Sequence, residues 1–207
     1  MHVEEQRAEI EECLAKYGRR PMELLNQVLR IDGNLIAVHC THTDPGDMAR
    51  FLESGGSVCV CPLTEANLGD GLPALDQVHA PGLRLSLGTD SNARIDFLEE
   101  MRWLEYGQRL RREQRGALLD PGGAAATALL DAATSAGALA LGVKAGRLEP
   151  GHWADLVAID LDAPALIGVG AEHLLEGLVF GAGSQVVSGT LVGGRWRRVG
   201  AEATPDP

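Results

Sequence analysis

The chain has 207 residues, a length that accommodates one sizeable domain or parts of two. Its residues are 45% hydrophobic but only 4% aromatic, so we expect a globular core of aliphatic side chains. The formal net charge of −11 argues against a surface for nucleic acid or for an anionic membrane, because either partner needs a basic face. No signal peptide and no bilayer-length apolar run is recognisable, so we expect a cytoplasmic protein.

The N-terminal two thirds of the chain alternate between short apolar runs and amphipathic segments. Strands are expected at residues 35–39, 57–61 and 83–87, and residues 1–3 have the pattern of a strand stub. Helices are expected within residues 4–20, ending at Gly18, and at 21–29, 44–53, 72–79 and 96–115. Strand and helix in alternation are typical of parallel α/β units.

The C-terminal third has a different pattern. A Gly/Pro-rich linker at 119–126 precedes an alanine-rich helix expected at 127–142. Strands are then expected at 154–160 and 186–195, separated by loops and turns. The four cysteines lack zinc-ribbon spacing, and we expect them to be buried thiols.

Polar side chains follow the expected strands at their C-terminal ends. His2, His39, Asn67 and Asp90 occupy these positions, and Asp90 follows a Gly88-Thr89 break after its strand. Histidine and aspartate at the ends of successive parallel strands are what a mononuclear zinc site on a barrel requires. The alternative interpretation is local, because aspartate also caps turns and helices and a lone histidine after a strand is often structural.

Two further residues need separate interpretations. His39 and His42 are three positions apart, so on an extended strand they point to opposite faces, and His39 is the better candidate for the site. His42 is expected to cap the next turn or to bond a backbone group. Glu5 follows His2 by one turn and is placed to act as a proton shuttle for a bound water. Its alternative role is that of a solvated glutamate at a helix start.

Several stretches, in this order and spacing, resemble the C-terminal half of the amidohydrolase superfamily, and within it the formimidoylglutamate deiminases. These are residues 2–6 (HVEEQ), 38–42 (VHCTH), 64–71 (TEANLGDG), 88–91 (GTDS) and 99–111 (EEMRWLEYGQRLR). Residues 151–157 (GHWADLV) resemble the return from the barrel to a small β-sandwich domain in these enzymes.

The resemblance implies a fold and a domain division. The expected class is α/β: a partial TIM-type (β/α) barrel, about strands 5–8, followed by the C-terminal part of a small β-sandwich domain. Residues 1–145 would form the partial barrel with its closing helices, residues 146–200 the sandwich strands, and residues 201–207 a disordered tail.

The resemblance also implies roles for individual residues. His2 resembles the metal-ligand histidine of the fifth barrel strand, and Asp90 the aspartate that contacts the metal and accepts the proton of the attacking water. Glu5 resembles the glutamate that passes protons to the substrate nitrogen. His39 resembles the histidine that hydrogen-bonds the water or the tetrahedral centre. The implied cofactor is Zn²⁺, with Fe²⁺ as the alternative.

The implied reaction is the hydrolysis of N-formimino-L-glutamate, a small-molecule substrate in histidine degradation, to N-formyl-L-glutamate and ammonia. The H-x-H pair that supplies two further metal ligands in the family does not occur in the chain. We therefore expect a C-terminal fragment that is inactive alone, needs the missing N-terminal half, and forms a homodimer when complete. The alternatives are another amidohydrolase deaminase acting on a cytosine-, guanine- or adenosine-like ring, and a non-catalytic remnant or complementing subunit.

Overall fold

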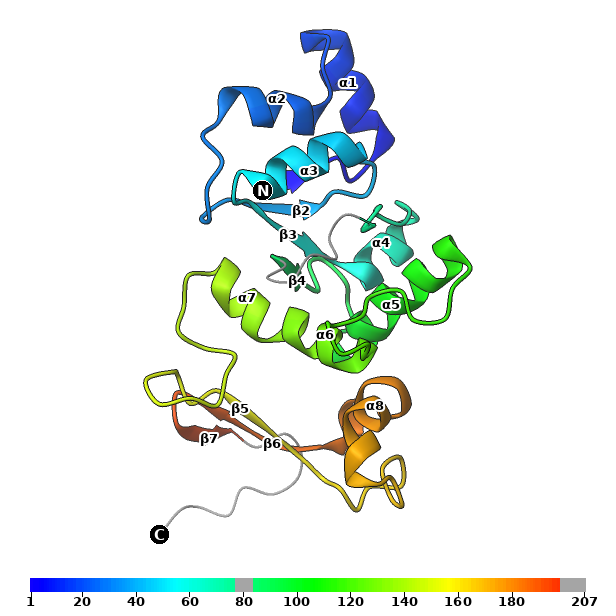
Figure 1. Ribbon diagram of the computed structural model, residues 1–207, viewed down its shortest axis with the longest axis vertical. Coiled ribbons are helices and arrows are strands. Elements are labelled where there is room, and N and C mark those ends of the chain that lie inside the picture. The colour runs from blue at the N-terminus through cyan, green and yellow to red at the C-terminus, as the bar shows by residue number, and fades with distance from the viewer. Residues whose placement is uncertain (77–83, 198–207) are drawn as a thin grey trace.

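A four-stranded parallel sheet forms the centre of the N-terminal part of the molecule. The computed structural model describes residues 1–76 and 84–197 (Figure 1). The strands lie in the order β1-β2-β3-β4, each parallel to its neighbour. Their bounds are β1 His2–Val3, β2 Ile36–His39, β3 Ser57–Val60 and β4 Leu85–Leu87. The spatial order of the strands follows their order in the chain. Because all four strands are parallel, their carboxyl ends lie at one edge of the sheet.

Helices connect the strands and flank the sheet. They are α1 Arg7–Tyr17, α2 Pro21–Val28, α3 Pro45–Glu53, α4 Pro62–Leu68 and α5 Phe97–Arg112. Gly18 ends α1 in the left-handed conformation with a φ of 68°, as the sequence predicts. The carboxylates of Asp44 and Asp96 accept backbone N–H groups at the first turns of α3 and α5.

A small antiparallel sheet follows near the C-terminal end of the described chain, in the order β5-β6-β7. Its strands are β5 Leu156–Ile159, β6 Val187–Val192 and β7 Arg195–Arg197. The prediction of one strand at 186–195 is wrong, because Gly193 and Gly194 both have positive φ values, 56° and 76°, and turn the chain into a hairpin. Between β5 and β6 lie the short helical segments η1 Ala171–His173, α8 Leu174–Glu176, η2 Gly177–Gly181 and η3 Ser184–Val186.

Two expected helices are corrected by the structure. The alanine-rich helix is two helices, α6 Ala125–Ala133 and α7 Ser135–Ala140, which break at Thr134, where ψ is −86°. The Thr134 backbone packs against Gly146, where a Cβ would lie 2.6 Å from the Thr134 carbonyl oxygen. The helix expected at 72–79 is wrong over 72–76, which have no helical structure, and 77–79 lie outside the described residues. The tail expected at 201–207 also lies outside them.

The core fills the space between the parallel sheet and its helices. Fully buried side chains from the strands and from α2, α3, α5 and α6 form one hydrophobic cluster. Phe51 on α3 lies over Gly56, where a Cβ would approach the ring to 2.5 Å, so the residue before β3 has to be glycine. The cysteines are free thiols; Cys40 and Cys61 are buried, and Cys13 and Cys59 are half-buried.

Helix α5 joins the parallel sheet to the C-terminal third of the chain. Its Glu105 is fully buried and accepts the backbone N–H groups of Ala117 and Leu118, both at 2.8 Å. Arg102 reaches from α5 to the carbonyl oxygens of Val179 and Ala182. These bonds to backbone hold the linker after α5 and the η2 segment against one helix.

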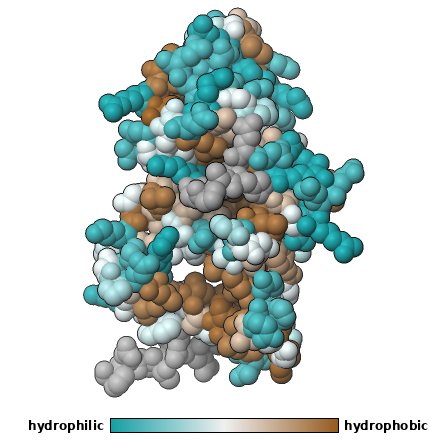
Figure 2. All heavy atoms as spheres, in the orientation of Figure 1, coloured by the Kyte–Doolittle hydropathy of each residue, from teal (hydrophilic) through white to brown (hydrophobic). Residues whose placement is uncertain are grey.

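Hydrophobic side chains are unevenly distributed over the surface. Figure 2 shows hydrophilic residues over the N-terminal helices at the top and more hydrophobic residues in the lower half of this face. Exposed apolar residues of the C-terminal half include Leu141, Leu148, Trp153, Val157 and Trp196, which are 59–83% exposed. None of the helices in the two described ranges combines the length and the apolar character that crossing a membrane requires.

A buried glutamate on α5 supports the start of α4. Glu100 is fully buried, and one carboxylate oxygen accepts the backbone N–H of Leu63 at 2.9 Å. The other oxygen has no hydrogen-bond partner within residues 1–76 and 84–197. Burial raises the pKa of Glu100 from 4.5 to about 7, against the lowering effect of the Leu63 bond. The ionised form is therefore disfavoured in the folded protein.

This shift predicts a pH dependence of stability. Below pH 4.5 Glu100 is protonated in both states, and above that pH the unfolded chain ionises first. The free energy of unfolding should therefore fall by about 2–3 kcal/mol as pH rises through the interval up to about 7. Glu100→Gln keeps an acceptor for Leu63 and should remove this part of the slope. Urea denaturation of parent and variant between pH 4.5 and 8 measures the difference.

Glu113→Gln is the matched control, because Glu113 is exposed at the opposite end of α5. Burial also raises the pKa values of Glu4 and Glu65, so the parent curve includes their contributions and the comparison rests on the difference between variants. If the free energy of unfolding had the same pH dependence in the parent and in Glu100→Gln, the slope could not be assigned to Glu100.

Candidate metal centre

Two histidine rings meet at the carboxyl edge of the parallel sheet. The register pairs His2 with Val38 and Val3 with His39, so β1 and β2 bring the two histidines to neighbouring positions. His2 Nδ1 lies 3.2 Å from His39 Nε2, and the rings are perpendicular with centroids 4.7 Å apart. His39 is fully buried, whereas His2 lies at the surface.

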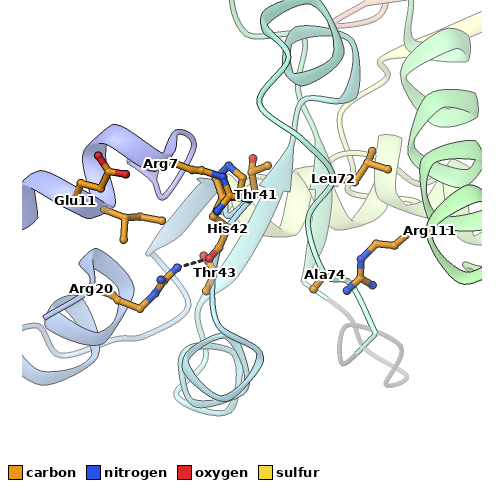
Figure 3. Close-up of a pocket in the computed structure, with 10 residues that line it drawn as sticks. Arg7, Glu11, Arg20, Thr41, His42, Thr43, Leu72, Ala74 and Arg111 are labelled. Carbon is orange, nitrogen blue, oxygen red and sulfur yellow. Dashed lines mark hydrogen bonds between the residues drawn. The ribbon is translucent and has the colours of Figure 1, made fainter. Parts of the chain in front are cut away.

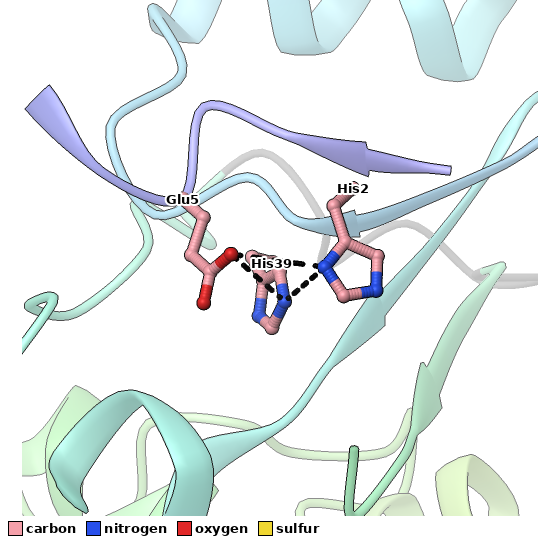
Figure 4. Close-up of side chains that lie close together, drawn as sticks. All are labelled: His2, Glu5 and His39. Atoms are coloured by element: carbon pink, nitrogen blue, oxygen red, sulfur yellow. Dashed lines mark hydrogen bonds and ion pairs between the residues drawn. The ribbon is translucent and has the colours of Figure 1, made fainter. Parts of the chain in front are cut away.

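Two carboxylates face this histidine pair. Glu5 Oε2 lies 3.7 Å from His2 Nδ1 and 3.6 Å from His39 Nε2, as drawn in Figure 4. The Asp90 oxygens lie 3.9 Å from His2 Nε2 and 3.8 Å from His39 Nε2. The structure therefore brings together all four residues that the sequence predicts for the site: His2, Glu5, His39 and Asp90.

The chain turns at the strand ends through left-handed backbone conformations. Glu4, His39, Cys40 and Asp90 have φ values of 52°, 73°, 53° and 42°, although none of them is glycine. Such conformations cost about 1–3 kcal/mol each and persist only where the surroundings impose them. Two of these strained residues, His39 and Asp90, belong to the cluster, which is where stored backbone strain is expected in a functional site.

Asp90 is positioned by contacts of the residues just before it. Gly88 lies against two thiols, because a Cβ there would be 3.1 Å from the sulfur of Cys61 and 3.2 Å from that of Cys59. The Thr64 hydroxyl donates to the Thr89 carbonyl at 2.8 Å. The chain after β4 is thereby held against β3 and α4, and it presents the Asp90 carboxylate to the histidines.

Glu65 is a site residue that the sequence analysis did not find. It is 2% exposed, and its Oε1 lies 3.1 Å from His39 Nδ1 and accepts the backbone N–H of Cys61 at 2.9 Å. Asn67, which the sequence placed at the strand end, is instead exposed on α4. The available signal was the C-P-x-x-E pattern: proline opens the helix and an acidic residue in its first turn bonds back to the N-cap.

Glu65 orients the His39 ring and affects its charge. With Nδ1 directed at the carboxylate, Nε2 faces the shared space between His2, Glu5 and Asp90. Burial lowers the pKa of His39, but the bond to Glu65 and the charges of Glu5, Glu65 and Asp90 outweigh it and raise the pKa. Burial raises the pKa of Glu65, and the contact with His39 opposes that shift.

The donor set fits a divalent metal ion. Ligand atoms of His2, Glu5 and His39 lie within 4.8 Å of one another. Two atoms bound to one tetrahedral Zn²⁺ lie about 3.3 Å apart, close to the 3.2 Å of the histidine pair. Imidazole nitrogen and carboxylate oxygen are the ligands that zinc accepts. Asp90 lies 3.8 Å from His39 Nε2, so a shift of about half an ångström brings it to the spacing of two ligands of one ion. Its contact with His2, at 3.9 Å, is to Nε2, the ring nitrogen on the other side from Nδ1.

His42 lies apart from this cluster. Its backbone N–H donates to the Glu4 carbonyl at 3.1 Å, and its ring bonds to the backbone of Asp70. It lines a separate cavity with Arg7 and Arg20. Of His39, the last residue of β2, and His42, which follows the strand, His39 is therefore the one in the cluster, as the sequence predicts.

Comparisons with known proteins identify the family of the chain. Residues 1–197 match the model of the amidohydrolase family. The chain is 41% identical over 198 residues to a formimidoylglutamate deiminase of Pseudomonas aeruginosa, covering 95% of this chain and 44% of the relative. It is 32% identical over 200 residues to a 5-methylthioadenosine/S-adenosylhomocysteine deaminase of Syntrophobacter fumaroxidans, covering 94% and 44%.

The chain is also similar to solved structures of an amidohydrolase and a deaminase. An amidohydrolase from Brucella melitensis has a TM-score of 0.85 at 32% identity, and a zinc-bound adenosine deaminase from Xanthomonas campestris has 0.85 at 30%. Each match covers 96% of this chain and 44% of the solved chain. The chain thus spans less than half the length of the relatives that it matches. Its sequence and its α/β fold with a parallel sheet place it in the amidohydrolase family.

Proposed function

We propose that this chain supplies the C-terminal part of a metal-dependent formimidoylglutamate deiminase. The observation that carries the reaction type is the convergence of His2, Glu5, His39 and Asp90, with contacts of 3.2–3.9 Å between them. The substrate rests on the 41% identity to the Pseudomonas aeruginosa deiminase. The second candidate is a deaminase acting on a purine ring, supported by the 32% identity to the 5-methylthioadenosine/S-adenosylhomocysteine deaminase.

In the proposed assignment His2 and Asp90 hold the metal, which is Zn²⁺ with Fe²⁺ as the alternative. The metal supplies Lewis-acid activation of a water molecule at neutral pH. Asp90 accepts the proton of the water, whose oxygen attacks the carbon of the substrate C=NH group. The nitrogen receives two protons through Glu5: the proton that left the water and the hydroxyl proton of the tetrahedral centre. The C=O bond of the product then forms, the C–N bond breaks, and ammonia leaves while N-formyl-L-glutamate remains.

His39 has a separate role in this mechanism. Its Nε2 faces the space where negative charge develops on the attacked centre, and the raised pKa favours the protonated, hydrogen-bond-donating ring. Glu65 is a positioning residue, because it contacts His39 and none of the other three cluster residues in the described contacts. Its buried carboxylate fixes which ring nitrogen faces the site.

The proposal includes a complementing segment. Catalytic zinc sites commonly use three protein ligands, and the assigned pair, His2 and Asp90, provides two. The relatives are more than twice as long, and the outer strands of the parallel sheet, β1 and β4, each pair with one neighbour in the described chain. Unpaired parallel edges favour association. We propose that a polypeptide equivalent to the N-terminal part of the deiminase completes both the sheet and the ligand set.

The proposal predicts enzymatic activity that depends on the complementing polypeptide. The chain mixed with the N-terminal part of the Pseudomonas aeruginosa deiminase should bind zinc and release ammonia from N-formimino-L-glutamate, whereas the chain alone should not. In the mixture, Asp90→Asn should lower kcat by about 10²–10⁴-fold, because the proton acceptor is lost. Metal content and an ammonia-coupled assay measure both effects.

Asp162→Asn, an exposed aspartate of the C-terminal third, is the matched control and should retain full activity. Faster turnover of 5′-methylthioadenosine than of N-formimino-L-glutamate would assign the purine substrate instead. If the two polypeptides formed a stable complex that turned over neither substrate, the chain would be assigned as a non-catalytic remnant. Full turnover by the chain alone would contradict the need for a complementing segment.

The positioning role of Glu65 predicts that its replacement changes the titration of His39. In the metal-free chain, Glu65→Gln should lower the pKa of His39, because a charged hydrogen-bond acceptor is replaced by a neutral one and burial then dominates. In the active mixture it should lower metal affinity or kcat by about 10–100-fold. NMR titration of labelled histidine gives the first readout.

Glu12→Gln, on the exposed face of α1, should leave the His39 titration unchanged. A Glu65→Gln chain with parental His39 titration and parental kcat would remove Glu65 from its positioning role.

A further inference from the structure

A second cavity, distinct from the metal centre, lies beside the residues that follow β2. It has a volume of about 390 Å³ and contains none of the four cluster residues in its lining (Figure 3). This volume is within the usual range for small-molecule sites, about 300–1,000 Å³. Its walls come from α1, the residue before α2, the segment after β2, the chain after α4, and α5.

Positive side chains dominate this lining. Arg7, Arg20 and Arg111 reach it from three separate segments. Arg20 pairs with Glu4 at 3.5 Å, and Arg111 pairs with Asp76. Arg7 has no carboxylate within ion-pair distance in the described part of the chain. Glu11, the one acidic residue in the lining, lies four positions further along α1 and forms no ion pair with Arg7.

One buried donor in the same lining lacks a protein acceptor. Thr41 is 5% exposed, and its hydroxyl has no hydrogen-bond partner among the described residues. Arg20 is held by the protein, because its Nε lies 3.5 Å from Glu4 Oε1 and its Nη2 donates to the His42 carbonyl. Buried donors without acceptors are uncommon in folded proteins. A bound acceptor-rich group would satisfy the Thr41 hydroxyl.

The electrostatic environment of His42 supports this interpretation. Burial and the charges of Arg7 and Arg20 lower its pKa, against the hydrogen bond and charge of Asp70. Arg7 is also the first residue of the 11-residue helix α1, whose N-cap residue Gln6 forms no side-chain cap.

We propose that this cavity binds a small organic molecule through a carboxylate or phosphate group. Arg7 pairs with the anionic group, and the Thr41 hydroxyl donates a hydrogen bond to it. The apolar side chains of Ile10, Leu72 and Ala74 contact the carbon part of the ligand. This site goes beyond the proposed deiminase function, because it uses a different set of residues.

Calorimetric titration of the purified chain with inorganic phosphate and, separately, with glutarate tests this proposal at constant ionic strength. Each probe carries one of the two candidate groups, and the tighter one identifies the preferred group. Arg7→Gln should weaken binding at least about tenfold, because a charge-assisted bond is lost. Thr41→Val, similar in shape, should weaken it about threefold or more. The assay requires neither metal nor turnover, so it is independent of the deiminase proposal.

Arg115→Gln is the matched control, since Arg115 is exposed outside the cavity and its loss changes the net charge by the same amount. It should bind both probes as the parent does, and circular dichroism verifies that each variant is folded. Equal weakening by Arg7→Gln and Arg115→Gln would overturn the site in favour of diffuse charge attraction. So would the absence of heat and of a melting-temperature shift in the parent at probe concentrations up to about 10 mM.

Discussion

The orientation of one buried imidazole is the constraint on which the candidate centre depends. His39 has no exposed surface, so both ring nitrogens need partners inside the protein. Glu65 takes Nδ1, and Nε2 is left for the space shared with His2, Glu5 and Asp90. Glu65 is itself held by the Cys61 N–H at the start of α4. The first turn of one helix therefore determines how a histidine from a different strand faces the site.

The backbone at the strand ends is strained, and contacts between neighbouring strands of the parallel sheet stabilise it. Glu4, His39, Cys40 and Asp90 adopt left-handed backbone conformations that glycine would adopt without strain. Glycine could not replace His39 or Asp90, because their side chains form the cluster. The hydrogen bonds from the Cys40 and His42 N–H groups to the carbonyl oxygens of Val3 and Glu4 hold the turns of β1 and β2 together. The strain is thus tolerated because neighbouring strand ends bond to each other.

The sequence predicted the parts of the fold that local patterns determine. Apolar runs located the four parallel strands to within two residues, and Gly18, Asp44 and Asp96 marked helix ends correctly. Its errors were of two kinds. The Gly193-Gly194 turn was a local signal that the strand assignment overlooked. The break at Thr134 is accompanied by a tertiary contact, because its backbone packs against Gly146, twelve positions away. The Glu65 carboxylate was overlooked because a glutamate in a first helical turn is ordinary, and only the buried His39 beside it gives it a role.

The same two chain segments contribute residues to the metal centre and to the arginine-lined cavity. The charged side chains at the two sites have opposite signs. Residues 2–7 contribute His2 and Glu5 to the metal centre and Arg7 to the cavity. Residues 39–42 contribute His39 to the metal centre, and Thr41 and His42 to the cavity. The bond from the His42 N–H to the Glu4 carbonyl joins these segments between the sites. Carboxylates thus gather where a cation fits and arginines where an anion fits. Because Glu5 and Arg7 are two residues apart, one short segment contributes both the proposed proton donor and the arginine proposed to bind the anion.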